Sequence, residues 1–211
     1  MRNRYEPLTL LLLTLSCLVI SGISPYDRTT WLLEVFPVMI GVPLLVVTSG
    51  RFPLTPVLYR LLFIHALILM VGGHFTYARV PLGVWMEHLF SFTRNNYDRI
   101  GHLAQGFIPA ILAREILLRR TPLQRGGWLF FLVVSVCLAF SACYELFEWW
   151  SALVGGDSAA DFLGTQGDQW DTQWDMFCAL IGAVAAQLLL APLHDRQLAE
   201  LVPMTVPAEA E

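Results

Sequence analysis

Three polar side chains recur at helical spacing in the middle of the chain. Asp98, His102 and Gln105 stand at positions i, i+4 and i+7, so a helix places them on one face. Asp98 is also placed to cap the N-terminus of that helix, where its negative charge is favourable. A cap is an ordinary structural role, but a histidine and a glutamine deeper on the same face favour a functional site if the helix crosses a membrane.

A second candidate is a pair of glutamates near the end of a long apolar run. Glu145 and Glu148 lie one turn apart, just before Trp149 and Trp150. Two partly desolvated carboxylates this close either share a proton or need a cation. The alternative is a pair of solvated acids at the membrane surface.

The stretch that leads into the last apolar run contains three aspartates. Asp168, Asp171 and Asp175 follow i, i+3 and i+7 spacing, so they share one face if the helix starts early. Any one of them is an ordinary acid in a first turn. Three acids exceed what a helix start requires. Trp170 and Trp174 between them are typical of the aromatic belt at a membrane surface.

Two more residues follow another apolar run. His74 comes directly after a pair of glycines, and Tyr77 lies one turn further if the helix continues. A lone histidine at such a place is more often interfacial than a ligand, so its interest depends on which membrane face it shares with the acids. His65 lies in the middle of the same run and falls outside the candidate set.

The composition indicates what kind of fold positions these residues. Of the 211 residues, 56% are hydrophobic and 14% are charged, against roughly a quarter charged in an average soluble domain. A helix needs about 20 mostly apolar residues to cross a bilayer, and several segments approach that length. The fold class is therefore all-α, a polytopic transmembrane helical bundle whose first partner is the lipid bilayer. The net charge of -4 indicates no nucleic acid partner.

The apolar runs predict six spans in one integral membrane domain, residues 1–195, followed by a cytoplasmic polar tail, residues 196–211. The predicted spans lie near residues 8–24, 30–49, 56–73, 99–118, 127–150 and 174–193. The first run follows a basic N-terminus, as in a signal peptide. No small-x-small cleavage site follows it, so we expect a retained span, although cleavage stays open.

The arginines predict the orientation, because positively charged loops are retained in the cytoplasm. The chain has 13 basic residues, all of them arginine, and only Arg28, Arg79, Arg94 and Arg99 fall on one side of the predicted membrane. The other nine fall opposite, which predicts that both termini lie inside (N-in/C-in). The long connections 74–98 and 151–173 are then external, so the candidate site faces outward.

The candidate site collects residues from four helix ends at this external face. The predicted catalytic residues are His102, Asp98, Glu145 and Glu148; the predicted metal ligands are His74, Asp98, His102, Asp171 and Asp175; and further predicted site residues are Gln105, Asp168, Arg99 and Tyr77. Nitrogen and oxygen ligands suit a hard or borderline divalent metal ion, which is the cofactor we expect.

Four motifs carry a resemblance to a known family. GGHFTYARVPLG, NNYDRIGHLAQGF, YELFEWW and FLGTQGDQWDTQWDM follow one another in this order. Through them the chain resembles, over nearly its whole length, the uncharacterised bacterial inner-membrane proteins of the YjdF type. The resemblance implies a multi-pass protein of the bacterial inner (plasma) membrane and no established activity.

A second, more distant similarity is to VanZ-like proteins, which are linked to glycopeptide-antibiotic tolerance. The matching residues are Asp98, Arg99, His102, the acid of the fifth span, Asp175, Ala179, Gly182 and Ala183. This similarity implies a role at the envelope face without naming a reaction.

Three functions remain open from the sequence. The first is an enzyme in which a metal held by His102, Asp98 and the acids activates water against a lipid-linked phosphate, ester or amide from the envelope; His102 or Glu145 could instead act as general base without metal. The second is a non-catalytic membrane component with a structural polar cluster. The third is a small transporter, which the absence of visible inverted repeats makes less attractive. No HExxH or GxSxG motif is present.

Overall fold

The computed structural model of the chain describes residues 5–155, 162 and 164–201. These residues form helices and no strand. The helices, in chain order, are α1 (Glu6–Ser21), α2 (Arg28–Thr48), α3 (Pro56–Phe75), the 3-10 turn η1 (Tyr77–Arg79), α4 (Pro81–Phe90), α5 (Tyr97–Arg120), α6 (Gly127–Gly155) and α8 (Asp171–Leu201). The predicted all-α fold is confirmed.

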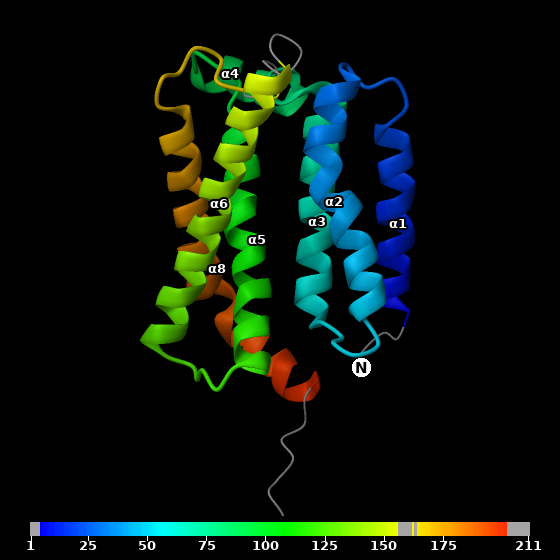
Figure 1. Ribbon diagram of the computed structural model, residues 1–211, viewed down its shortest axis with the longest axis vertical. Helices are drawn as coiled ribbons and strands as arrows, with labels where there is room; N and C mark the ends of the chain where they lie inside the picture. Colours follow the sequence, from blue (N-terminus) through cyan, green and yellow to red (C-terminus); the bar gives the residue numbers. More distant parts are fainter. Residues whose placement is uncertain (1–4, 156–161, 163, 202–211) are drawn as a thin grey trace, which may run out of the picture.

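The long helices stand side by side and alternate in direction, so that α1 begins and α8 ends at the same end of the bundle (Figure 1). A helix lies over each of the six predicted segments. Among the described residues, four helices are long and apolar enough to cross a membrane: α2, α3, α6 and α8. Helix α1 has 16 residues, which is shorter, and α5 carries charged side chains in both its first and last turns.

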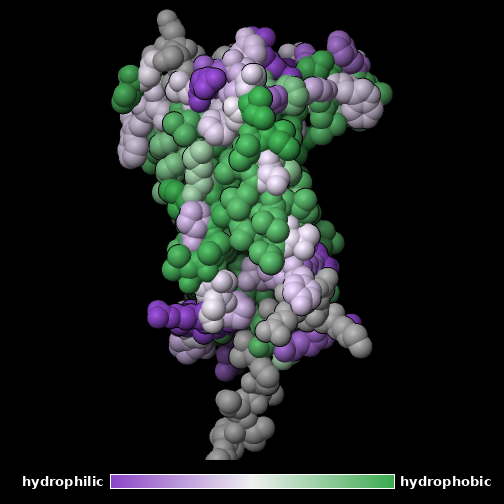
Figure 2. Space-filling model, turned by 90° about the vertical axis from the view of Figure 1, so that its right-hand side faces the viewer, coloured by the Kyte–Doolittle hydropathy of each residue, from purple (hydrophilic) through white to green (hydrophobic). Residues whose placement is uncertain are grey.

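The outer surface of the bundle fits this assignment. On the face that Figure 2 shows, hydrophobic residues cover the middle of the molecule and hydrophilic residues gather at both ends. Large apolar side chains such as Val47, Phe140 and Leu189 are exposed. A water-soluble monomer rarely exposes a continuous apolar surface of this size.

Several boundaries differ from the sequence prediction. Connection 74–98 contains η1 and α4. Helix α3 ends at Phe75 because Thr76 has a φ of 66°, which a right-handed helix does not accept. The helix does not continue to Tyr77. Tyr77 therefore does not lie one turn beyond His74 on the same face, which the spacing predicted for a continuing helix. Residues 196–201 of the predicted polar tail continue α8, and residues 202–211 lie outside the described residues.

The predicted capping role of Asp98 is wrong. Helix α5 begins at Tyr97, and the residue at the cap position is Asn96, whose side chain makes no cap hydrogen bond. Asp98 lies inside the first turn of α5. Its charge is still favourable near the helix N-terminus, but its carboxylate is free to point into the bundle.

The helices pack as two groups of three, α1–α2–α3 and α5–α6–α8, which meet along α3 and α5. The tightest contact is between α5 and α8. A Cβ atom added to Gly106 would overlap the carbonyl of Ala179, and one added to Gly182 would overlap the carbonyl of Leu103. Small residues that allow two backbones to approach this closely are typical of membrane helix pairs.

A buried polar cluster stabilises the end of the bundle where α5 ends. Glu115 and His194 are fully buried, and His194 Nε2 lies 3.1 Å from Glu115 Oε2. Thr55 Oγ1 and Arg119 each donate a hydrogen bond of 2.7 Å to Glu115, and Arg114 lies 2.7 Å from His194 Nδ1. Every carboxylate oxygen and ring nitrogen of this inner cluster has a partner. It therefore joins the start of α3 to α5 and α8 as a structural element.

The α5–α8 contact yields a test of the fold. Gly182→Ala should lower the thermal unfolding temperature of the purified protein, because the added methyl group must push the α5 backbone away; overpacking of this kind costs about 1–3 kcal/mol. The matched control is Gly127→Ala, where an added Cβ meets nothing within 4 Å. Equal unfolding temperatures for the two variants would contradict the packing.

Candidate metal centre

Three predicted site residues converge where α5 and α8 begin. Asp98, His102 and Asp175 each offer one ligand atom, and these atoms all lie within 4.8 Å of one another. All three side chains are buried. Helical spacing within α5 places the first two one turn apart, with Asp98 Oδ1 3.5 Å from His102 Nε2. The close α5–α8 contact then brings Asp175 to them from the facing helix.

Gln105 lies beside His102 Nδ1, the ring nitrogen that does not face Asp98. Its Oε1 lies 3.0 Å from Nδ1, so a neutral ring that donates its Nδ1–H to Gln105 presents the lone pair of Nε2 to Asp98. Metal-binding histidines commonly donate their other ring N–H to an oxygen in this way. The predicted face of Asp98, His102 and Gln105 therefore has the arrangement of a metal-binding histidine whose second ring nitrogen contacts an oxygen.

Helix α6 adds two carboxylates to the same region. Glu145 and Glu148 are both buried, and Glu145 Oε1 lies 3.6 Å from His102 Nδ1. Glu145 Oε1 has no hydrogen-bond partner among the described residues, nor does Asp175 Oδ1. A buried polar atom without a partner is expensive. These two oxygens therefore need a proton, a water molecule or a cation.

Helix α2 contributes a residue that the sequence analysis missed. Glu34 is buried, and Tyr144 donates a hydrogen bond of 3.4 Å to its Oε2. Gly73 gives it room, since a Cβ atom there would lie 3.1 Å from Glu34 Cβ. The sequence signal was available, because Glu34 is an acid within an apolar run long enough to span a membrane, and such acids are commonly functional.

Asp171 is the first residue of α8, and Asp168 lies just before the helix. The carboxylates of both residues form ion pairs with arginines. Arg94 forms an ion pair with Asp171 and lies 3.6 Å from both Asp98 Oδ2 and Asp168 Oδ2. Arg99 forms an ion pair of 2.6 Å with Asp168. The structure thus places the predicted ligand Asp171 in an ion pair at the edge of the cluster, outside the group of three.

The pKa of the Asp168 carboxyl lies below its usual range. The main cause is the hydrogen bond of 2.9 Å that it accepts from the backbone N–H of Trp170, and Arg99 contributes next. Both interactions favour the ionised form. The ion pair of Asp168 with Arg99 therefore connects the loop before α8 to the start of α5.

Arg94 also holds that loop in place, a role that its position in the connection 74–98 did not predict. Its guanidinium donates hydrogen bonds to the carbonyls of Gly164 and Thr165, at 3.1 and 3.2 Å. Asn95 and Gln166 exchange two further hydrogen bonds, of 3.0 and 2.9 Å. The loop is thereby fixed over the N-terminus of α5, which closes the acidic cluster from outside.

His74 and Tyr77 lie apart from the group of three. His74 Nδ1 lies 2.9 Å from the carbonyl of Ser21, so the ring ties the end of α3 to the end of α1. The Tyr77 ring fills the space left by Gly72 and also approaches Gly101, and burial raises the pKa of its hydroxyl. The structure places His74 with the α1–α2 turn rather than with Asp98.

Comparison with known proteins places the chain in a family. The family described as "Predicted membrane protein (DUF2238)" matches residues 6–196. The chain is also 56% identical over 187 residues to "Inner membrane protein YjdF" of Escherichia coli (strain K12), which covers 88% of this chain and 90% of that protein. No solved structure matches. These similarities confirm the predicted YjdF-type resemblance and the location in the bacterial inner membrane, and the chain belongs to the DUF2238 family of predicted membrane proteins.

Proposed function

We propose that the chain binds one divalent metal ion between Asp98, His102 and Asp175, and uses it in hydrolysis or group transfer on a lipid-linked or envelope substrate. The observation that carries the proposal is the convergence of three buried donors within 4.8 Å. Ligand atoms that share one ion at 2.0–2.6 Å lie within about 5 Å of each other, so the donor spacing supports a single shared ion.

The orphaned oxygens favour a bound ligand over a purely structural cluster. The inner cluster around Glu115 is buried too, and its donors and acceptors are matched. The cluster of Asp98, His102, Glu145 and Asp175, which we call the outer cluster, leaves Glu145 Oε1 and Asp175 Oδ1 without partners among the described residues. A structural cluster gains nothing from unpaired carboxylate oxygens, whereas a metal site requires them.

Glu145 is the residue we assign as general base. It lies on the Nδ1 side of His102, with Oε1 3.6 Å from that nitrogen, and it is not one of the three converging donors. A metal ion lowers the pKa of bound water, and a neighbouring carboxylate can accept the proton that the water loses. Glu148, one turn further along α6, extends the acidic wall of the site.

A transporter is less well supported. Between the outer and inner clusters lies an apolar core that includes Leu58, Ala110, Ile111, Val133 and Ala183. A transporter of ions needs polar groups near the middle of the membrane. In the middle of α8 the buried Gln187 donates its amide N–H groups to the backbone carbonyls of Phe130 and Ala183, which is a structural role.

We further propose that the chain crosses the membrane six times with both ends in the cytoplasm. Arg114, Arg119 and Arg125 lie at the end of the bundle that holds the inner cluster, which suits the cytoplasmic side. The metal centre then opens toward the envelope. The VanZ-like resemblance predicted from Asp98, His102 and Asp175 stays a prediction, and it would imply a function at that face.

Metal binding tests the function directly. We expect the purified chain to bind one Mn²⁺ or Zn²⁺ in isothermal titration, and His102→Ala and Asp175→Asn to weaken that binding at least tenfold, because each removes a ligand. His88→Ala is the matched control, since His88 is exposed on α4. In the wild type, metal-dependent release of phosphate or fatty acid from prenyl diphosphate or phospholipid vesicles should disappear in Glu145→Gln while metal binding remains.

Equal metal affinity in all these variants would contradict the site. Metal binding without metal-dependent release of either product would leave the ion and overturn the proposed hydrolysis of these two substrate classes.

The proposed orientation has its own test. In a variant without native cysteines, a cysteine introduced by His88→Cys should react with a membrane-impermeant maleimide in spheroplasts, whereas one introduced by Gln124→Cys should react only after lysis. Both positions are exposed. The opposite labelling pattern would place the metal centre in the cytoplasm.

A further inference from the structure

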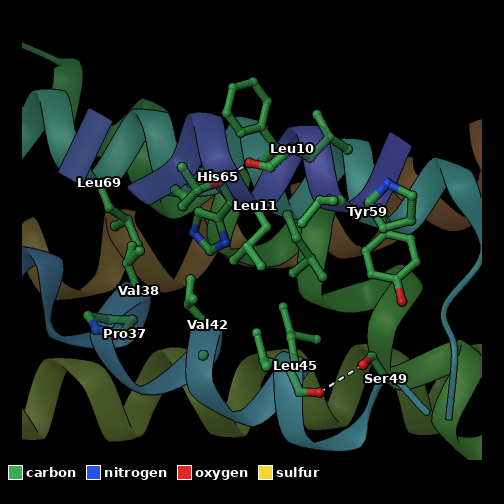
Figure 3. Close-up of a pocket in the computed structure, with 18 residues that line it drawn as sticks. Leu10, Leu11, Pro37, Val38, Val42, Leu45, Ser49, Tyr59, His65 and Leu69 are labelled. Atoms are coloured by element: carbon green, nitrogen blue, oxygen red, sulfur yellow. Dashed lines mark hydrogen bonds between the residues drawn. The ribbon is translucent and has the colours of Figure 1, made fainter. Parts of the chain in front are cut away.

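An apolar groove lies between α1 and α2, with α3 as its floor. We call it the α1–α2 groove, and its volume is about 350 Å³. Figure 3 shows Leu11 from α1, Val42 and Leu45 from α2, and Tyr59 and His65 from α3 lining the cavity. A volume of 300–1,000 Å³ is typical of small-molecule sites.

The sequence of α2 explains why the groove is not filled. Pro37 and Pro43 lie inside this helix, and proline disturbs helix packing because it removes a backbone N–H and its ring meets the preceding turn. Gly41 lies between them and lines the groove, and a Cβ atom there would meet nothing within 4 Å. Helix α2 thus leaves open space opposite α3.

His65 is the polar feature of the groove floor. It is the tenth of the 20 residues of α3, a helix long and apolar enough to span a membrane, so it lies near the bilayer midplane. Its ring extends toward α2 between Leu11 and Val42 (Figure 3). Among the residues that the structure describes, none forms a hydrogen bond with it. An imidazole N–H at this depth gains from an acceptor supplied by a ligand.

The depth of His65 and the apolar lining together restrict the occupant. Charged lipid head groups stay at the membrane surface, far from His65. The remaining candidates are uncharged molecules with a long chain and a hydrogen-bond acceptor that reaches the midplane.

We propose that the α1–α2 groove binds an isoprenoid quinone. Its ring carbonyl accepts a hydrogen bond from His65, and its chain lies along Leu11, Val42 and Leu45. The metal centre is built from other residues at the external end of the bundle, so this site does not depend on it. The proposal concerns binding and needs no electron transfer.

The test uses the full chain in nanodiscs free of quinone, with decylubiquinone as the probe and decylbenzene as a probe that has the chain and ring without carbonyls. We expect saturable decylubiquinone binding by the wild type. Gly41→Leu, which fills the groove and suits a helix, should abolish it. His65→Leu should weaken decylubiquinone binding by about three- to tenfold, the effect of one hydrogen bond, and leave decylbenzene binding unchanged.

Two matched variants control for folding. Gly127→Leu adds the same side chain at another open helical glycine, and Ile64→Leu changes the exposed neighbour of His65; both should bind as the wild type does. Undiminished binding by Gly41→Leu would overturn the proposal, as would equal effects of His65→Leu on both probes. A wild type that binds neither probe, or one whose groove is closed by a second copy in a cross-linked dimer, would overturn it too.

Discussion

The structure depends on the burial of carboxylates that lack enough positive charge beside them. Asp98, Glu145 and Asp175 are buried with His102 at the end of the bundle where α5 and α8 begin, and the buried Glu34 comes from α2. Removing a carboxylate from water is costly unless it gains a partner or a proton. Arg94 lies 3.6 Å from Asp98, but Asp175 Oδ1 and Glu145 Oε1 have no hydrogen-bond partner among the described residues. The metal ion that we propose would give these oxygens a positively charged partner and so offset the cost. The close contact of α5 with α8 and the loop fixed by Arg94 both hold the acids in that geometry.

The two ends of the bundle treat their buried charges differently. Around Glu115 and His194 the donors and acceptors are matched, and the cluster ties α3, α5 and α8 together without need of a ligand. Around His102 the match is incomplete. Since both clusters sit on the same α5–α8 pair, the contrast reflects the choice of side chains rather than the packing. We therefore attribute stability to the Glu115 end of the α5–α8 pair and propose binding at the His102 end. An apolar core lies between the two ends.

Much of this arrangement follows from local rules, and what does not follow is long-range. Apolar runs predict where helices lie, and helical spacing predicts that Asp98, His102 and Gln105 share a face. The pairing of Arg94 with Asp171 joins residues 77 positions apart, so no local pattern reports it. Tyr77 leaves the α3 face because Thr76, with a φ of 66°, ends the helix. His74 lies within α3 and contacts the carbonyl of Ser21 instead of the acids. Glu34 was visible as an acid in an apolar run, but its place beside the other acids depends on how α2 meets α6.

We propose as the central claim that His102 and two aspartates hold one ion where α5 and α8 begin. The most direct measurement is electron spin echo envelope modulation of Mn²⁺ bound to the purified chain, because this signal reports nitrogen atoms coordinated to the metal. The account predicts nitrogen modulation from one imidazole in the wild type, lost in His102→Ala and retained in His74→Ala. Absence of nitrogen modulation in the wild type, or its persistence in His102→Ala, would contradict the account.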